Sequence, residues 1–375
     1  MKQQACKKET RGDGAGIPCF TVPLFPKQKK PLDRSGSRLL RFNNDKQGGR
    51  RPLKPELFQV PACEEAAEMN RNLRSERQRK KIISLICMVG PFFFMLLLFK
   101  IIPIFANISY SFLNTSIRSD GTFVGLKNWK KLLNDKLFWT ATKNTFQYLL
   151  YVGPANIILG FLFALLLNQK LHGRIVVRGL IFFPYVLMTT VVGVIWRWIL
   201  DGGNMGVLNY YLGKLGIDTI YFLTDKSTAM LGVAIASIWW TVGYNTVIYL
   251  AALQDVPRDI IEAAAIDGAT GFERVIHIYL PLVKGSTFFV VLTTVIYSMQ
   301  MFGQVYVMTN GGPSYSTLTI VQYLYIKAFK EAKLGYASAI GVALLLLLIV
   351  LSAIIFWLFR NKDIVKTRKA VNSHG

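Results

Sequence analysis

The feature that most constrains this chain is a set of six long apolar segments. Each is close to the roughly 20 residues that an α-helix needs to cross the hydrocarbon core of a bilayer. They are predicted at 82–104, 146–167, 180–199, 229–252, 287–308 and 337–359. Inside lipid no water is available to bond the backbone, so such segments fold as helices that satisfy their own amide groups. The sequence therefore predicts an all-α protein with six transmembrane helices.

Clusters of Lys and Arg at the span ends set the predicted orientation. ERQRKK at 76–81 precedes the first span, and RNKDIVKTRK at 360–369 follows the sixth. Lys170, Arg174 and Arg178 separate the second span from the third. Placing these clusters inside puts both termini in the cytoplasm. The first outside loop, which also holds six Lys or Arg residues, fits less well, but long loops count for little in this rule.

The N-terminal region differs from the rest in composition. Residues 1–81 hold 20 of the 44 Lys and Arg residues, and residues 1–68 mix Pro, Gly, Ser and charge without usable periodicity. This composition is typical of disorder. We expect a basic, disordered cytoplasmic tail at 1–80, a transmembrane domain at 81–365 and a second cytoplasmic tail at 366–375. Met69 opens a compact cytoplasmic start, so the sequence leaves open whether residues 1–68 belong to the native protein.

The net charge of +23 points to a membrane surface rather than to nucleic acid. The basic residues flank hydrophobic spans, so retention beside an anionic lipid leaflet explains them better than binding to nucleic acid does. We therefore expect contact with membrane lipid and no nucleic-acid partner.

The spans contain few groups that could carry chemistry. Lys100 and Arg197 are the ionisable residues in or at the edge of the spans, and no Asp or Glu lies within them. An ion-coupled carrier commonly needs such a carboxylate. The sequence has no G-x-x-x-x-G-K-[ST] loop for ATP phosphates, and its three His and four Cys residues form no metal-ligand pattern. We expect no enzymatic activity, no cofactor and no metal, so a transporter built on this chain would draw its energy from another subunit.

The loop between the fourth and fifth spans, residues 253–285, is polar and strongly patterned. Asp255 predicts a helix start as its cap, and Gly268 suits the left-handed position that ends a helix. Thr270 and Glu273 form a capping box that starts a second helix. The sequence therefore predicts a compact helix–turn–helix on the cytoplasmic side of the membrane.

The first helix of this loop carries small and acidic residues. Ala263 and Ala264 permit close approach by a partner, and Glu262 and Asp267 offer negative charge to a basic surface. An amphipathic helix lying on lipid headgroups is the simpler alternative. Such helices are normally rich in Lys and Arg, whereas residues 253–285 hold five acidic and three basic residues. Docking to a protein is therefore favoured.

The spacing within the loop is specific. Glu262-Ala263-Ala264, Gly268, Ile278 and Leu280-Pro281 reproduce the pattern EAA-x3-G-x9-I-x-LP. This resembles the signature loop of ABC importer permeases. Four other stretches are similar to segments of the sugar-uptake branch of that family, the maltose, glycerol-phosphate and multiple-sugar type. They are FVGLKNW (123–129) and FWTATKNT (138–145) in the first outside loop, WRWILDGGNMGVLN (196–209) after the third span, and TNGGPSYSTLTIVQYLYIKAF (309–329) after the fifth.

The resemblance, which covers roughly residues 80–365, implies a fold and a set of partners. The fold would be a six-helix permease of the type I ABC importer kind in the bacterial cell membrane, forming half of a translocation pathway. The partners would be two cytoplasmic ATP-binding subunits, a second permease subunit and an extracellular substrate-binding protein. We expect a heterodimer of permeases, with a homodimer as the alternative. The loop would be the coupling helix, with Glu262, Ala263, Ala264, Asp267 and Gly268 as its contact and turn positions.

Polar and aromatic residues in the fourth and fifth spans are candidates for the substrate path. They are Trp240, Tyr244, Asn245, Tyr297, Gln300 and Gln304. A sugar has hydroxyls that bond amides and ring faces that pack on aromatics, so this combination suits a carbohydrate. The alternative is that these residues only join helices together.

The main interpretation is a membrane subunit of an ATP-driven carbohydrate importer, coupled to a separate ATPase through the EAA loop. Two alternatives stay open. One is an ABC importer permease for another solute, such as glycerol phosphate or a peptide. The other is a membrane scaffold or signalling protein that binds a cytoplasmic partner. The sequence does not identify the sugar or the partner subunits.

Overall fold

The structure is a computed structural model that describes residues 62–116, 119–169, 172–203 and 206–360, with side chains from residue 79 onward except at 119 and 120. The chain divides into two units, Met1–Glu76 and Arg77–Gly375, and apart from the start of α1 the features described below belong to the second. The tail expected at 366–375 and most of the N-terminal tail lie outside the described residues.

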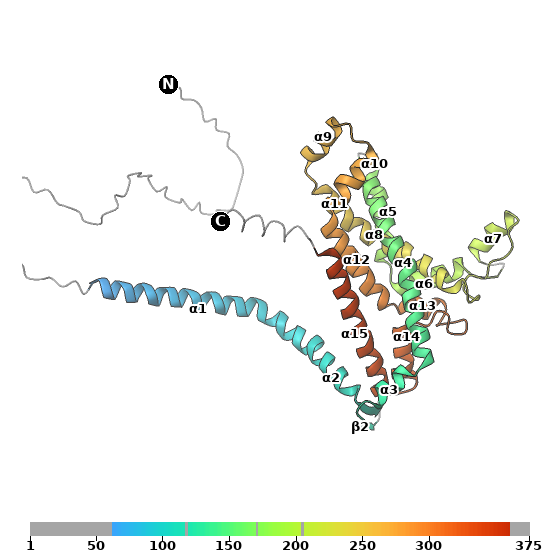
Figure 1. The fold of residues 1–375 in the computed structure, drawn as a ribbon, viewed down its shortest axis with the longest axis horizontal. Coiled ribbons are helices and arrows are strands. Elements are labelled where there is room, and N and C mark those ends of the chain that lie inside the picture. Colours follow the sequence, from blue (N-terminus) through green and yellow to red (C-terminus); the bar gives the residue numbers. More distant parts are fainter. Residues whose placement is uncertain (1–61, 117–118, 170–171, 204–205, 361–375) are drawn as a thin grey trace, which may run out of the picture. The chain divides into compact units, whose positions relative to one another are not determined.

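Helices dominate the described part of the chain (Figure 1). In order they are α1 (Ala62–Leu96), the π-helix η1 (Leu97–Ile101), α2 (Ile102–Tyr110), α3 (Lys127–Leu133), α4 (Lys136–Asn168), α5 (Arg174–Val186), α6 (Thr189–Ile199), α7 (Val207–Lys214), α8 (Ala229–Gln254), α9 (Arg258–Ile266), α10 (Gly271–Arg274), η2 (Val275–Tyr279), α11 (Leu280–Leu282), α12 (Lys284–Met299), α13 (Gly303–Met308), α14 (Ile320–Tyr325), η3 (Ile326–Lys330) and α15 (Leu334–Phe359). The strands β1 (Leu113–Ser116) and β2 (Ser119–Phe123) pair antiparallel.

Part of the region expected to be disordered is helical. Residues 62–80 form the first half of α1, which continues into the first apolar span. The stretch CEEAAEMNRNLRSERQRKK, residues 63–81, is rich in Ala, Glu, Arg and Lys, which are strong helix formers. The mixture of Pro, Gly, Ser and charge that predicted disorder lies mostly before residue 62, and the residues from there to the first apolar span favour a helix.

Five helical stretches of the described chain are long and apolar enough to cross a membrane. They are Arg79–Tyr110, Lys136–Asn168, Ala229–Gln254, Lys284–Met308 and Leu334–Phe359. The predicted third span, 180–199, passes the same test only as the pair α5 and α6, which are bent by 101°. Leu187 and Met188 between them adopt extended backbone angles, which interrupts the helical hydrogen bonds. The prediction of six apolar helical segments is confirmed, but the third is not one straight helix.

The fifth span is also interrupted, between α12 and α13. Gln300 closes α12, and Phe302 has non-helical angles before α13 begins at Gly303. Irregular backbone at membrane depth needs new hydrogen-bond partners. The hydroxyl of Thr319 supplies one by donating to the carbonyl oxygen of Met301 at 2.8 Å. The break is therefore held by the segment that leads into α14.

The first outside loop contains regular secondary structure. Strands β1 and β2 form a hairpin within it, and α4 begins at Lys136, so residues 138–145 are helical rather than loop. The hydropathy pattern placed the span later because these first turns are polar. Their polar groups are bonded instead of hydrated: the Asn144 amide donates to the carbonyl oxygen of Tyr315 at 2.7 Å, and the Thr145 hydroxyl accepts from the amide of Ile320 at 3.1 Å.

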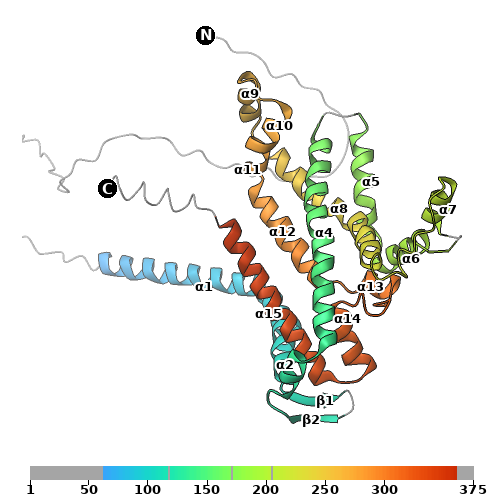
Figure 2. The same ribbon diagram turned by 45° about the vertical axis from the view of Figure 1, so that its right-hand side comes forward.

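Helix α8 packs extensively against α4, with α5 and α12 beside them (Figures 1 and 2), and a further core cluster joins the start of α4 to α14 and α15. Small residues allow transmembrane helices to approach closely. At Gly243 of α8, a Cβ atom would lie 2.2 Å from the carbonyl oxygen of Ile181, so any side chain there would push α5 away. In both views α9 and α10 lie at one end of the helices and β1, β2 and α3 at the other.

Candidate functional site

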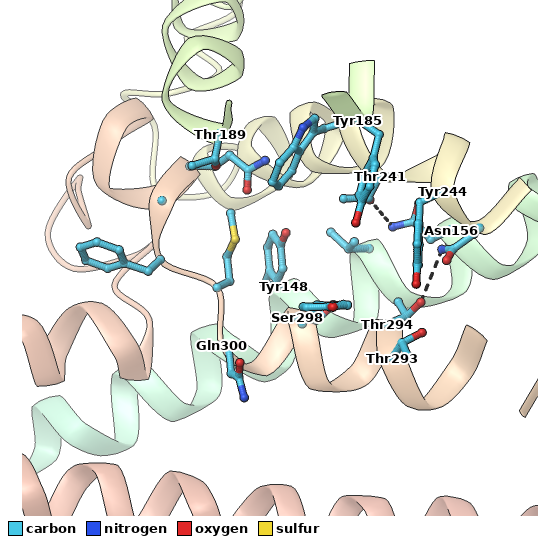
Figure 3. A pocket seen from close by; sticks show the side chains of 18 residues that line it. Tyr148, Asn156, Tyr185, Thr189, Thr241, Tyr244, Thr293, Thr294, Ser298 and Gln300 are labelled. Carbon is cyan, nitrogen blue, oxygen red and sulfur yellow. Dashed lines mark hydrogen bonds between the residues drawn. The ribbon is translucent and has the colours of Figure 1, made fainter. Parts of the chain in front are cut away.

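A cavity of about 330 Å³ lies among α4, the end of α5, the start of α6, α8, α12 and the break before α13. Figure 3 shows tyrosines and short polar side chains from these elements turned toward the same space. The bend between α5 and α6 and the break between α12 and α13 both lie beside the cavity. Part of its boundary is therefore backbone that is not helical. Such backbone within a membrane is tolerated where it lines a cavity or is buried in protein.

All the side chains that the sequence singled out for a substrate path line this cavity. They are Trp240, Tyr244 and Asn245 from α8, Tyr297 from α12, Gln300 from the break and Gln304 from α13. Tyr297 and Gln300 are exposed, whereas Asn245 and Gln304 are buried. These six side chains therefore lie around one cavity. The passage of cargo between them remains a prediction.

Aromatic rings form one wall of the cavity. The rings of Tyr185 and Tyr244 are stacked with centroids 4.9 Å apart, and that of Trp240 lies 6.2 Å from Tyr185. The indole N–H of Trp240 donates to the carbonyl oxygen of Leu187 at 3.1 Å, in the bend between α5 and α6. The wall is thus fixed to the bend by a hydrogen bond.

The amides of the cavity are unequally satisfied. The side-chain NH₂ of Asn245 lies 3.4 Å from the Thr294 hydroxyl, and that of Asn156 donates to the Thr241 hydroxyl at 2.9 Å. Gln304 is fully buried, and neither its Oε1 nor its Nε2 has a hydrogen-bond partner among the described residues. The Oδ1 of Asn156 is also without one there. A buried polar group left unpaired costs about 1–3 kcal/mol, so these atoms retain capacity to bind polar groups of a ligand or water.

The sequence analysis did not identify several residues that line the cavity. They are Tyr148, Asn156, Tyr185, Thr189, Thr241, Thr293, Thr294 and Ser298. An amide within an apolar run was a usable signal for Asn156, which lies in the predicted second span. No local pattern marked Tyr185, because it reaches the cavity only through the bend that follows it.

The cavity lining is uncharged. Among the described residues that line it there is no Asp, Glu, Lys, Arg or His. An unpaired ion in such a lining would lose its hydration without gaining a counter-charge, which is strongly unfavourable. The chemistry of the lining therefore suits a neutral solute with hydroxyl groups and apolar faces.

The second candidate region is the loop of α9 and α10. Gly268 has φ of +80°, which confirms the left-handed position predicted for it. The amide of Ala269 donates to the carbonyl oxygen of Ala264 at 2.9 Å, and that of Gly268 donates to Ala265 at 3.2 Å. These two bonds form a Schellman motif, which ends a helix where glycine can adopt the left-handed angles.

The predicted capping box is confirmed at the start of α10. The amide of Thr270 donates to Oε2 of Glu273 at 2.7 Å, and the amide of Glu273 donates to the Thr270 hydroxyl at 3.3 Å. The hydrogen bonds from the backbone and side chain of Thr270 hold the pKa of the Glu273 carboxyl below its ordinary value.

The predicted cap at Asp255 is wrong. Helix α8 runs through Gln254, and Asp255 forms its C-terminal end, with its amide donating to the carbonyl oxygen of Ala251 at 3.2 Å. Helix α9 begins instead after Pro257, whose position makes no side-chain capping bond. The span is longer than its apolar run, so it reaches the residue that the local pattern assigned to the next helix.

The loop presents an exposed surface of mixed character. Glu262, Ala263, Asp267 and Gly268 are exposed, and Ala264 is partly so. Two large apolar side chains that the sequence analysis did not single out stand beside them: Ile266 is 86% exposed and Phe272 is 74% exposed. Exposed apolar side chains gathered with polar ones are typical of a contact surface for another protein.

Comparisons with known proteins give consistent results. The family model described as "Binding-protein-dependent transport system inner membrane component" matches residues 156–363. The chain is 34% identical to the probable ABC transporter permease protein YurN of Bacillus subtilis over 279 residues, 73% of this chain and 94% of that protein. It is 31% identical over 292 residues to the trehalose/maltose transport system permease protein MalF of Thermococcus litoralis, covering 77% of this chain and 97% of that protein.

A further relative is the arabinooligosaccharides transport system permease protein AraP of Bacillus subtilis, 34% identical over 71% of this chain and 85% of that protein. The fold is similar to a chain in the crystal structure of a bacterial alginate ABC transporter in complex with an alginate pentasaccharide-bound periplasmic protein. The TM-score is 0.67 at 21% identity, and the match covers 76% of this chain and 96% of that chain.

Proposed function

This chain belongs to the binding-protein-dependent transport system inner membrane component family, and we propose that its cargo is a neutral carbohydrate, carried by an ATP-driven importer of which it forms half of the pathway. The chain is a multi-pass permease of the cell membrane. The observation that carries the proposal of a carbohydrate is the cavity, whose uncharged lining combines aromatic rings with amides and hydroxyls.

The side chains of the cavity match the two surfaces of a sugar ring. The rings of Tyr185, Tyr244 and Trp240 offer apolar faces, against which the C–H face of a pyranose or furanose packs. The unpaired amide of Gln304 and the unpaired oxygen of Asn156 offer hydrogen bonds for hydroxyl groups. Relatives named for arabinooligosaccharides and for trehalose or maltose support the same class of cargo.

The same lining disfavours the alternative solutes. A glycerol phosphate would bring a charge into a space with no Lys or Arg among the residues that line it, and a free peptide would bring charged termini. Phosphate is normally bound by Arg, by Lys or by backbone amides at a helix start. A neutral sugar therefore suits this cavity better than glycerol phosphate or a peptide does.

The proposed connection to ATP hydrolysis is the loop of α9 and α10. It would dock in a groove of a separate ATP-binding subunit, with Glu262, Ala263, Ala264, Asp267 and Gly268 at the contact and the turn. The exposed side chains of Ile266 and Phe272 support this, because they offer apolar area to a partner. Hydrolysis itself would belong to the partner chain, and the loop and both termini would face the cytoplasm.

The full importer would contain this chain, a second permease, two ATP-binding subunits and an extracellular substrate-binding protein. The test is reconstitution of that complex in proteoliposomes with labelled maltotriose, arabinotriose, diacetylchitobiose and glycerol 3-phosphate. We expect ATP-dependent accumulation of at least one neutral sugar and none of glycerol 3-phosphate. Accumulation of glycerol 3-phosphate alone would contradict the neutral-carbohydrate assignment, and no flux with any solute would favour a scaffold role.

A further inference from the structure

Four aromatic rings in mutual contact lead away from the cavity, and we call them the aromatic ladder: Phe302, Tyr306, Tyr325 and Phe329. Phe302 lines the cavity itself. Its ring is stacked on Tyr306 with centroids 5.2 Å apart and lies 5.2 Å from Tyr325. The Tyr306 and Tyr325 rings are 5.6 Å apart, and Tyr325 lies 5.3 Å from Phe329. The ladder therefore continues from the cavity to the end of η3 without a gap.

The ladder follows from the spacing of its members on two short helical segments. Phe302 and Tyr306 are four residues apart at the start of α13, and Tyr325 and Phe329 are four residues apart where α14 passes into η3. Residues at this spacing lie on the same side of a helix. The pairs face each other because the Thr319 hydroxyl, at the start of α14, donates to the carbonyl oxygen of Met301 beside Phe302.

The far end of α14 is also held in place. The hydroxyl of Tyr323 donates to the carboxylate of Asp135, the residue that caps α4. Lys327 forms an ion pair with Glu331 at 2.5 Å across the end of η3. The segment of α14 and η3 is therefore tied to the break before α13 at its start and to the cap of α4 through Tyr323, which fixes Tyr325 beside Phe302 and Tyr306.

The ring at the end of the ladder farthest from the cavity is the most exposed of the four. Phe302 and Tyr325 are partly exposed, Tyr306 is 38% exposed and Phe329 is 64% exposed. Figures 1 and 2 place α14 nearer to the β1–β2 end of the helices than to α9 and α10. The ladder thus runs from the cavity toward the end of the domain opposite the coupling loop, where an imported solute would arrive.

We propose that the aromatic ladder is an approach track on which a neutral sugar moves from the outer end of η3 into the cavity. Each ring offers an apolar face to a sugar ring, and the hydroxyls of Tyr306 and Tyr325, which interact with each other, stand at intermediate positions, each with capacity for a further hydrogen bond. A series of similar weak contacts lets a solute pass from one ring to the next without a deep energy well. This proposal rests on carbohydrate import as the function; the other possible occupant of these faces is the second permease.

The test uses the full importer and the probes maltotriose, arabinotriose and diacetylchitobiose. Phe329→Ala removes the most exposed ring of the ladder, so its effect on folding is small. We expect the KM for uptake to rise about fivefold, because one stacking contact on the approach is lost. Phe329→Trp, which keeps a ring, should restore the wild-type KM. Phe105→Ala on α2 is the matched control: Phe105 is 65% exposed but lies outside the ladder, so its KM should not change.

The outcomes distinguish failure of the track alone from failure of carbohydrate import. A raised KM with the second permease still co-purifying supports the track. An unchanged KM for Phe329→Ala overturns it while leaving carbohydrate import intact. Loss of the second permease from the purified complex also overturns it, because the ladder would then be a subunit contact. If the wild-type importer carries none of the three sugars, carbohydrate import fails and the track fails with it.

Discussion

The loop of α9 and α10 and the cavity differ in where their hydrogen bonds come from. In the loop, Gly268, Ala269, Thr270 and Glu273 bond residues no more than five positions away. In the cavity, Asn156 bonds Thr241 and Trp240 bonds Leu187, across 85 and 53 positions. The loop is thus an autonomous rigid element suited to transmit a displacement, whereas the cavity is a property of the whole helix arrangement and changes when any helix moves.

The largest expected effect tests the rigidity of the loop. Gly268→Asp places a side chain at φ of +80°, where it is strained although the surrounding space is open. We expect membrane insertion to persist and ATP-driven uptake to fall by about a hundredfold or more, because a displaced turn no longer meets the ATPase. Uptake in proteoliposomes and co-purification of the ATP-binding subunit are the measurements.

The chain offers a matched control for this change. Gly216, which follows α7, has φ of +76° and open space around it, so Gly216→Asp introduces the same backbone strain outside the loop. Uptake by Gly216→Asp should stay close to the wild type. If both variants lose uptake equally, backbone strain rather than the coupling contact is responsible, and the assigned role of Gly268 is wrong.

The next effect tests the cavity. Gln304→Leu removes a buried amide whose two polar atoms have no partner among the described residues. Because no protein hydrogen bond is lost, thermal stability should stay equal or rise, while the KM for sugar uptake rises about tenfold through a lost contact to the cargo. Thermal unfolding in detergent and uptake kinetics measure the two quantities separately.

Asn144→Leu is the contrasting variant. The Asn144 amide donates to the carbonyl oxygens of Tyr315 and Leu318 at 2.7 and 3.0 Å, so its loss should lower stability by about 1–3 kcal/mol. If Gln304→Leu destabilises the protein as Asn144→Leu does, the Gln304 amide has a structural partner and is not reserved for cargo.

A smaller effect tests the second helix of the loop. Thr270→Ala removes the hydroxyl that accepts from the amide of Glu273 at 3.3 Å, which should destabilise α10 locally by about 1 kcal/mol. Faster hydrogen exchange of the amides at 271–274 measures the loss. Thr270→Ser keeps the capping oxygen and should exchange as the wild type does; equal exchange in Thr270→Ala would show that the cap does not stabilise the loop.

The smallest effect concerns pH. Hydrogen bonds from Thr270 hold the pKa of Glu273 below its ordinary value. The capping contribution is therefore complete above the ordinary value of about 4.3 and is lost as the pH falls through the lowered pKa. Hydrogen exchange of α10 relative to other helices should rise only once the pH has fallen below that ordinary value. Glu273→Gln keeps an acceptor for the Thr270 amide but does not titrate, so this additional rise should be absent from it.

The same contrast explains which features could be predicted from the sequence. The left-handed Gly268 and the Thr270–Glu273 box were predictable because each is set by bonds within a few residues. The apolar segments were predictable because hydropathy is a local sum. The bend at Leu187–Met188 and the break at 300–302 were not, since an average over twenty residues conceals a two- or three-residue interruption. The prediction of a helix cap at Asp255 was wrong because packing against other helices sets the length of α8.

The cavity residues show the limit of local reasoning. Six residues of the cavity were predicted from spans four and five, because amides and aromatic residues cluster there in the sequence. Tyr185 and Thr189 joined them through the bend between α5 and α6, and Tyr148 and Asn156 through the packing of α4 on α8. Those contacts depend on the angles between helices, which no short pattern specifies.

The hydrogen bond between the Trp240 indole and the carbonyl oxygen of Leu187 joins the bend to the wall of the cavity. If the angle between α5 and α6 opens or closes from its 101°, either this bond breaks or the indole follows the carbonyl. Where the bond holds, the wall of the cavity moves with the bend, and the space open to a solute changes with the angle between α5 and α6. In a variant whose other six tryptophans are replaced, the fluorescence of Trp240 would therefore report movement at the wall of the cavity.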